Sequence, residues 1–179
     1  MQRMSLITVT VLSLLAAYAA PQVQAQSSDD HAIIGVWSLN LIASSFEPGP
    51  GPKALTRHFL MDDDGYMVSI RVTVTGAGNP TFALARTKLD GKDYPVWTNL
   101  SVYQFLSSEA LPMNTAAMEA VNDRTMQLTQ KNAEGEPGPL SPNVWEVSPD
   151  GNTLTVTTTG TTADGEDVHN VEIFDRVQN

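Results

Sequence analysis

The chain lacks cysteine and is poor in basic residues. Without cysteine it has neither a disulfide nor a thiol nucleophile, so its stability must come from a hydrophobic core. Ten lysines and arginines stand against twenty acidic residues, which gives a formal net charge of −10. An acidic surface repels phosphate groups, so we expect no nucleic-acid partner and no adsorption to anionic membranes.

Recognisable catalytic and metal-binding motifs are also missing. No Gly-x-Ser-x-Gly elbow occurs, and the three histidines form neither His-x-His nor His-x-x-x-His spacing. Residues 62–65 carry three consecutive carboxylates, but an EF-hand needs ligands at alternate positions of a twelve-residue loop. We therefore interpret 62–65 as a solvated turn, and we expect neither a metal nor a cofactor.

Long hydrophobic runs are absent apart from one near the start. Residues 6–20 are apolar, follow Arg3 and precede a small-x-small pattern at 23–25, so residues 1–25 are expected to be an export signal. The run is shorter than the ~20 apolar residues that span a bilayer. We therefore expect residues 26–179 to form one periplasmic or secreted domain without an integral membrane segment.

What the sequence does contain is a series of turns between alternating strands. The clearest hairpin spans 148–176, with Asp-Gly turns before each of its two strands. Leu154 and Val156 alternate with threonines on the first strand, and Val171 and Ile173 have the same period of two on the second. This pattern predicts a long antiparallel hairpin whose core face carries these four apolar residues.

Other stretches alternate in the same way. We expect strands at 33–40, 54–61, 66–75, 81–89, 101–106, 124–131 and 143–147, with turns at 62–65, 76–80 and 90–93. Residues 114–121 contain helix formers, and they form either one or two helical turns or a strand through 118–121. Eight to ten strands with frequent turns favour an all-β barrel or sandwich. Of the two we expect the barrel, small, antiparallel and up-and-down.

Four stretches together resemble a family of exported bacterial lipocalin-like (calycin-type) proteins. They are residues 35–40, which read Gly-Val-Trp-Ser-Leu-Asn, and residues 50–53, 90–96 and 148–176. The spaced set covers most of the expected domain. The resemblance implies a small closed β-barrel with an internal cavity, and it implies no particular activity.

The same resemblance suggests how the barrel is closed. It implies that Trp37 closes the bottom of the barrel and that Arg176, from the last strand, lies on its indole ring. Such a cation–π contact contributes ~0.5–2 kcal/mol. Gly35, just before Trp37, would allow a close approach of the backbone where the chain enters the barrel.

Three aromatic residues fall in a segment that is longer here than in the family pattern. Trp97, Tyr103 and Phe105 either belong to the core or form a lid at the mouth of the barrel. The Pro/Gly-rich loop 134–142 is a second departure from that pattern. Long loops at a barrel mouth commonly hold ligand contacts, so we predict that the three aromatic residues bind a ligand.

Arginines on strands stand out in a chain with so few basic residues. Arg57, Arg71 and Arg86 are all on expected strands. Arg71 is out of phase with the neighbouring valines, so exposure to solvent is its first interpretation. If polar residues line the barrel instead, an inward arginine would pair with the carboxylate of an anionic ligand. Arg57 or His58 would then be the polar group that orients the ligand.

The histidines offer a second kind of chemistry. His58 and His169 both lie in the middle of expected strands, and they could act as an acid/base pair if they faced one cavity. His169 shares its face with the apolar residues of its strand. His31 lies in a polar leader and is expected to be disordered.

Three functions are consistent with these observations. The first is an exported protein that binds a small apolar or amphipathic ligand in the barrel through Trp97, Tyr103, Phe105 and either Arg57 or His58. The second is a barrel enzyme of isomerase or lyase type that uses His58 or His169 as proton donor or acceptor. The third is a structural protein of the envelope with a filled barrel. The pattern leaves the oligomeric state open.

Overall fold

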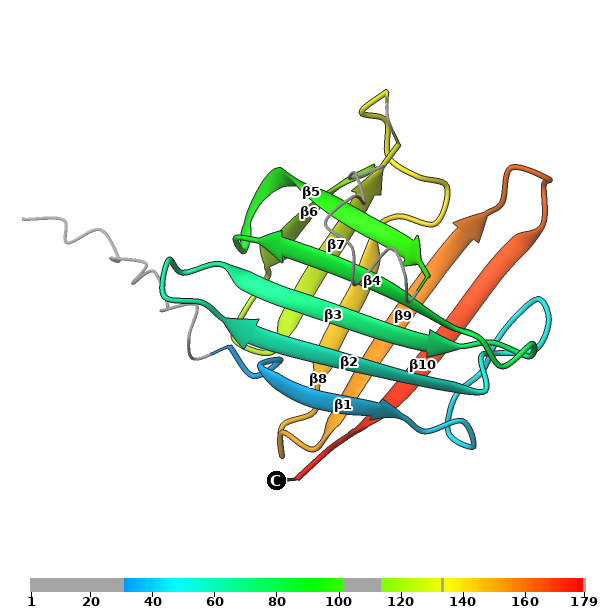
Figure 1. Cartoon of the computed structure of the whole chain (residues 1–179), viewed down its shortest axis with the longest axis horizontal. Helices are drawn as coiled ribbons and strands as arrows, with labels where there is room; N and C mark the ends of the chain where they lie inside the picture. Colours follow the sequence, from blue (N-terminus) through cyan, green and yellow to red (C-terminus); the bar gives the residue numbers. More distant parts are fainter. Residues whose placement is uncertain (1–30, 102–113, 133, 179) are drawn as a thin grey trace, which may run out of the picture.

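The computed structural model of the chain describes residues 31–101, 114–132 and 134–178. Ten antiparallel strands in this part form one closed barrel, in which each strand pairs with its neighbours in sequence and the last pairs with the first (Figure 1). The strands are β1 Gly35–Leu39, β2 Ala54–Met61, β3 Met67–Val74, β4 Pro80–Thr87, β5 Asp90–Leu100, β6 Asn114–Ala120, β7 Thr125–Lys131, β8 Asn143–Val147, β9 Thr153–Thr161 and β10 Asp167–Arg176. The expected all-β, up-and-down barrel is confirmed.

The segment that could have been helix or strand is a strand. β6 pairs with β5 on one side and with β7 on the other. Its buried residues, Ala116 and Met118, alternate with less buried neighbours, so the helical alternative is wrong and the period of two prevails. Within the described ranges, no helix is long and apolar enough to cross a membrane.

β5 differs from its expected boundaries. The turn expected at 90–93 lies inside this strand, and the pairing of β5 with β6 is irregular between Asp90 and Asp93. Gly91 has a φ of 72° there, so the Asp-Gly pair produces a local irregularity instead of a reversal of the chain. Most of the strand expected at 101–106 lies outside the described residues.

Strands β7 and β9 direct into the barrel the face that the sequence pattern predicted. Met126 and Leu128 of β7 are buried, and so are Leu154 and Val156 of β9. The threonines that alternate with the β9 residues lie on the outer face. Each buried side chain of this size contributes about 1.5–3 kcal/mol through removal from water.

Strand β10 directs into the barrel the face opposite to the one expected from the sequence. Its buried apolar residues are Val168 and Phe174, so Val171 and Ile173 lie on the outer face and their predicted core position is wrong. The connection between β1 and β2 continues beside β10, where the backbones of Ser45 and Val171 exchange two hydrogen bonds of 2.9 Å. Val171 and Ile173 are half-buried on this outer face.

β3 also directs its polar residues inward. Met67 is fully buried, and Ser69, Arg71 and Thr73 share its face by alternation. The valines and the isoleucine between them lie on the outer face, where they are half-buried. The expectation that Arg71 faces solvent is therefore wrong, and the alternative of an inward arginine is correct.

The two ends of the barrel carry connections of different length. At one end, here called the mouth, lie the connections 40–53, 75–79, 132–142 and 162–166. At the other end, the base, lie the connections 62–66, 88–89, 121–124 and 148–152, none longer than five residues. The chain enters the first strand and leaves the last strand at the base.

The base is fastened by a contact between the first and last strands. Trp37 is fully buried, and its Nε1 donates a hydrogen bond to the Ile33 carbonyl at 2.8 Å. The guanidinium carbon of Arg176 lies 4.1 Å from the centre of the Trp37 ring, and its Nη1 donates to the Ile34 carbonyl at 2.8 Å. Arg176 thus joins the entering chain to the end of β10.

His31 is part of this base, so the expectation that it is disordered is wrong. Its Nδ1 accepts a hydrogen bond from the Ile33 N–H at 3.2 Å, and its Nε2 lies 2.9 Å from the Asn122 carbonyl oxygen. Both contacts are satisfied by a neutral ring that carries its proton on Nε2. Burial lowers the pKa of His31, and the hydrogen bond to Asn122 only partly opposes this.

Replacing Gly35 by alanine should weaken the base. Gly35 has a φ of 137°, and a Cβ there would lie 2.5 Å from Nη1 of Arg176. We expect Gly35→Ala to lower the free energy of unfolding by about 1–3 kcal/mol in urea titrations. Gly76→Ala is the control, because a Cβ at Gly76 meets nothing within 4 Å and should change stability by less than about 0.5 kcal/mol. Equal losses in both variants would contradict this role.

The lowered pKa of His31 predicts a loss of stability in mild acid. The unfolded chain takes up a proton at His31 near pH 6.5, whereas the folded chain resists protonation until lower pH. The contribution of the neutral ring is therefore complete above pH 6.5 and declines as the pH falls. Thermal unfolding between pH 7.5 and 5 should show a steeper decline for the natural chain than for His31→Gln. His169→Gln, at an exposed position, should keep the natural slope; parallel slopes in all three would refute the assignment.

Candidate functional site

The described residues border two cavities of the barrel, one nearer the mouth and one nearer the base. The outer cavity, of about 330 Å³, is bounded by the prolines of the connection 40–53 and by inward residues near the mouth ends of β2, β3 and β4. The inner cavity, of about 60 Å³, is bounded by residues of β2 to β8. Arg71 borders both. Two positions nearer the mouth than Arg57, Arg71 and their partner on β4, the paired residues are Leu55, Thr73 and Thr81. These three border the outer cavity.

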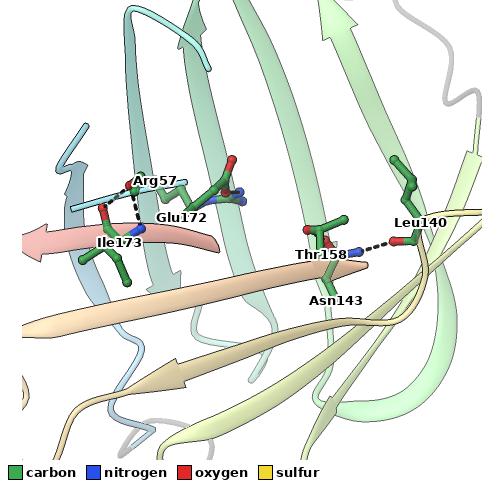
Figure 2. A network of polar contacts seen from close by, with 7 residues as sticks. Arg57, Leu140, Asn143, Thr158, Glu172 and Ile173 are labelled. Atoms are coloured by element: carbon green, nitrogen blue, oxygen red, sulfur yellow. Dashed lines mark hydrogen bonds and ion pairs between the residues drawn. The ribbon is translucent and has the colours of Figure 1, made fainter. Parts of the chain in front are cut away.

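Arg57 lies inward on β2 and is well compensated. Only 7% of the residue is exposed, and its Nη2 donates to Oε2 of Glu172 on β10 at 2.8 Å (Figure 2). Its guanidinium carbon also lies 4.8 Å from the centre of the Trp145 ring and 5.2 Å from that of Phe174. One carboxylate and two aromatic faces therefore hold this charge in place.

Arg71 lies directly opposite Arg57 on the next strand and lacks such compensation. The two residues are register partners, and Arg71 forms no ion pair within the described part of the chain. Burial lowers the pKa of Arg71 to about 10, with a further lowering by the charge of Arg57 and an opposing effect from Glu172. The interior thus holds two guanidinium groups and one carboxylate at this level.

Three hydrogen-bond donors around the inner cavity have no acceptor. Nε of Arg57, Nε of Arg71 and Nε1 of Trp145 are buried without a partner among residues 31–101, 114–132 and 134–178. All three residues border the inner cavity. A buried donor that lacks an acceptor costs roughly 1–3 kcal/mol, more if it is charged. Three such donors at one small cavity suit an incoming acceptor, such as an oxyanion.

The mouth has a second polar cluster that holds a connection against the barrel. Thr158 of β9 donates a hydrogen bond to the Asn143 side chain, and Nδ2 of Asn143 donates to the Leu140 carbonyl at 2.7 Å (Figure 2). Gly160 has a φ of 155°, and a Cβ there would lie 2.1 Å from the Pro139 carbonyl oxygen. The connection 132–142 therefore packs closely on β9, and this packing shapes one side of the mouth.

Of the residues that the sequence had grouped as a ligand site, the structure brings two to one cavity and places one elsewhere. Trp97 of β5 is half-buried and borders the inner cavity, as does Arg57. Tyr103 and Phe105 lie outside the described residues. His58 follows Arg57 and therefore points to the opposite face of β2, and it borders neither cavity.

The two histidines do not face a common cavity, so the condition stated for an acid/base pair is not met. His169 is exposed on β10, on the outer face that it shares with Val171. His58 is on the outer face of β2, paired with Ile70 of β3. The period of two that places Arg57 inside necessarily places His58 outside.

No group of three side chains in the described ranges is arranged to hold a metal ion. At the acidic turn 62–65, one oxygen of Asp62 accepts from the backbone N–H groups of Asp64 and Tyr66. Its other oxygen accepts from Nε of Arg86 at 2.6 Å. These contacts lower the pKa of Asp62. The carboxylate of Asp62 therefore stabilises the turn itself and the neighbouring Arg86.

Sequence reasoning missed two residues that shape the interior, Glu172 and Trp145, and it gave the inward setting of Arg71 only as an alternative. A signal for Arg71 was present, because Ser69 and Thr73 share its phase and form a polar row. Trp145 shares its phase with Val147, but a five-residue strand is too short to fix a face from pattern alone.

Comparison with known proteins finds similar solved structures but no matching family. No family model matches the chain, and no curated protein matches it. Seven chains of solved structures do match. One is the zebrafish ileal bile acid-binding protein complexed with cholic acid, at 13% identity and a TM-score of 0.48, over 82% of this chain and 99% of that one. The barrel and the site geometry described above come from this chain's own strand pairing and contacts.

Proposed function

We propose that this protein binds a small apolar or amphipathic ligand inside the barrel. The observation that carries the proposal is the outer cavity, whose volume of about 330 Å³ lies in the range of small-molecule sites. Phe46, Leu55 and the prolines of the connection 40–53 give it apolar surface, and its polar surface comes from Arg71, Asn170, Glu172 and three threonines. A ligand body there would contact apolar surface on one side and polar groups on the other.

The two other functions considered from the sequence receive less support. Acid/base catalysis by His58 or His169 needs at least one of them at a cavity, and neither borders one. A purely structural role needs a filled interior, whereas the described part of the chain encloses two cavities and has three buried donors without acceptors. Ligand binding accounts for both features.

We also propose that the protein acts in the periplasm or outside the cell, as the resemblance to exported lipocalin-like proteins suggests. Native mass spectrometry of the protein purified from its own envelope tests this together with binding. The polypeptide mass should correspond to a chain that begins at Gln26, and a small molecule should be retained. A mass that includes residues 1–25 would contradict the proposed export signal.

Blocking the outer cavity should abolish ligand binding. Thr73 points into it, so Thr73→Phe should weaken binding of the neutral fluorescent probe N-phenyl-1-naphthylamine by about tenfold or more, measured by fluorescence titration. Val72→Phe is the matched control, because Val72 is next to it on the outer face of β3 and should bind the probe within about twofold of the natural chain.

Circular dichroism and thermal unfolding check that both variants fold. Equal binding by the two folded variants would show that the probe does not use the outer cavity. Absence of binding by the natural chain, together with absence of any retained small molecule, would refute the proposed function.

A further inference from the structure

We propose that the ligand is an organic monoanion, and that its carboxylate enters the inner cavity and is bound by Arg71, with the Trp145 indole N–H and Nε of Arg57 as further donors. This inference rests on the proposed function and names the chemical class of ligand for the same site. The apolar body of the ligand then occupies the outer cavity. The carboxylate of the ligand therefore points inward, and its apolar body lies toward the mouth.

The charges inside the barrel favour an anion. Arg57 and Arg71 are direct cross-strand partners, a like-charge arrangement that destabilises a sheet. Glu172 neutralises Arg57 at 2.8 Å, which leaves one positive charge in excess. A carboxylate carries one negative charge and balances this excess, whereas a phosphate monoester carries about −1.5 to −2 at neutral pH.

The donors favour a planar oxyanion. A carboxylate has two oxygens with about four acceptor sites, and it accepts charge-assisted hydrogen bonds from guanidinium groups. The inner cavity is bordered by three residues whose Nε or Nε1 donors lack acceptors, namely Arg57, Arg71 and Trp145. Two of these residues are more than nine-tenths buried, Arg57 with 7% exposed and Trp145 with 3%.

The two volumes set the orientation. About 60 Å³ accommodates a group of a few atoms, such as a carboxylate, but it is well below the ~300 Å³ at which drug-sized sites begin. The outer cavity reaches that range, and Phe46, Leu55 and the prolines of the connection 40–53 supply apolar surface beside its polar residues. Arg71 borders both, so a carboxylate at its guanidinium continues directly into a body at the mouth.

The acidic surface of the protein does not prevent an anion from binding. Exposed carboxylates on the mouth connections include Glu134, Glu136, Asp164 and Glu166. Their repulsion acts through solvent, where physiological salt screens it over about 8 Å. The attraction of a buried arginine is screened far less. The mouth charges would therefore slow the approach of an anion more than they weaken its final binding.

Competition against the neutral probe tests the charge of the ligand. Decanoate and decanol have the same chain length and differ in the head group. With the natural chain, decanoate should displace N-phenyl-1-naphthylamine at a concentration about tenfold or more below that of decanol. Decyl phosphate should compete less well than decanoate, because its head group is larger and carries more charge.

Arg71→Met should remove the preference for decanoate while decanol competes as before. Arg86→Met is the control, since Arg86 is an exposed arginine on the neighbouring strand and pairs with Asp62 and Asp64. It should keep the full preference. Arg71→Met should also unfold at the same or a higher temperature, because an uncompensated buried charge is replaced by an apolar chain of similar length. Arg71→Lys, which keeps a charge, should retain part of the preference.

The outcomes separate the two proposals. If decanol competes as well as decanoate with the natural chain, or Arg71→Met keeps the preference, the anion inference is wrong while the proposed binding function stands. If decyl phosphate competes better than decanoate, the carboxylate assignment is wrong. If Arg71→Met unfolds at a clearly lower temperature and Arg71→Lys restores stability without the preference, Arg71 is structural. If no probe or competitor binds, both proposals fall.

Discussion

The alternation of side chains around a closed barrel is the constraint on which the interior depends. Because the barrel has no free edge, the direction of one side chain sets the direction of its partners on the neighbouring strands. Trp37 is buried, and Arg57 is its register partner on β2. Arg71 is the partner of Arg57, and Ala83 is the partner of Arg71. Packing the tryptophan inside therefore brings both arginines inside with it.

This arrangement has an energetic cost that the rest of the barrel offsets. Arg57 recovers much of its desolvation through Glu172 and two aromatic rings, whereas Arg71 has no comparable partner. The stability comes from a buried apolar cluster to which all ten strands contribute, together with the stack of Arg176 on the indole at the base. The stable base and the polar, partly open interior near the mouth therefore lie at different levels along the barrel axis.

Much of the architecture was predictable, because turns and period-two alternation are local signals. The boundaries of β2 and β8 and the buried faces of β7 and β9 follow from the sequence alone. The candidate site was predicted less well. Arg57 was singled out for its rarity on an expected strand, but so was His58, and adjacent strand residues cannot share a face. Arg71 was assigned to solvent because its alternating valines resembled a core face.

The sequence by itself determined that this protein is all-β, where most of its strands lie and which residues of those strands share a face. Only the tertiary structure decided which of the two faces is inside. On β3 and β10 the more apolar face, with residues such as Ile70 and Ile173, lies outward. A period of two groups side chains but does not choose a side, and that choice is made collectively by all ten strands through their register. The polar interior, and with it the candidate site, belongs to that collective choice.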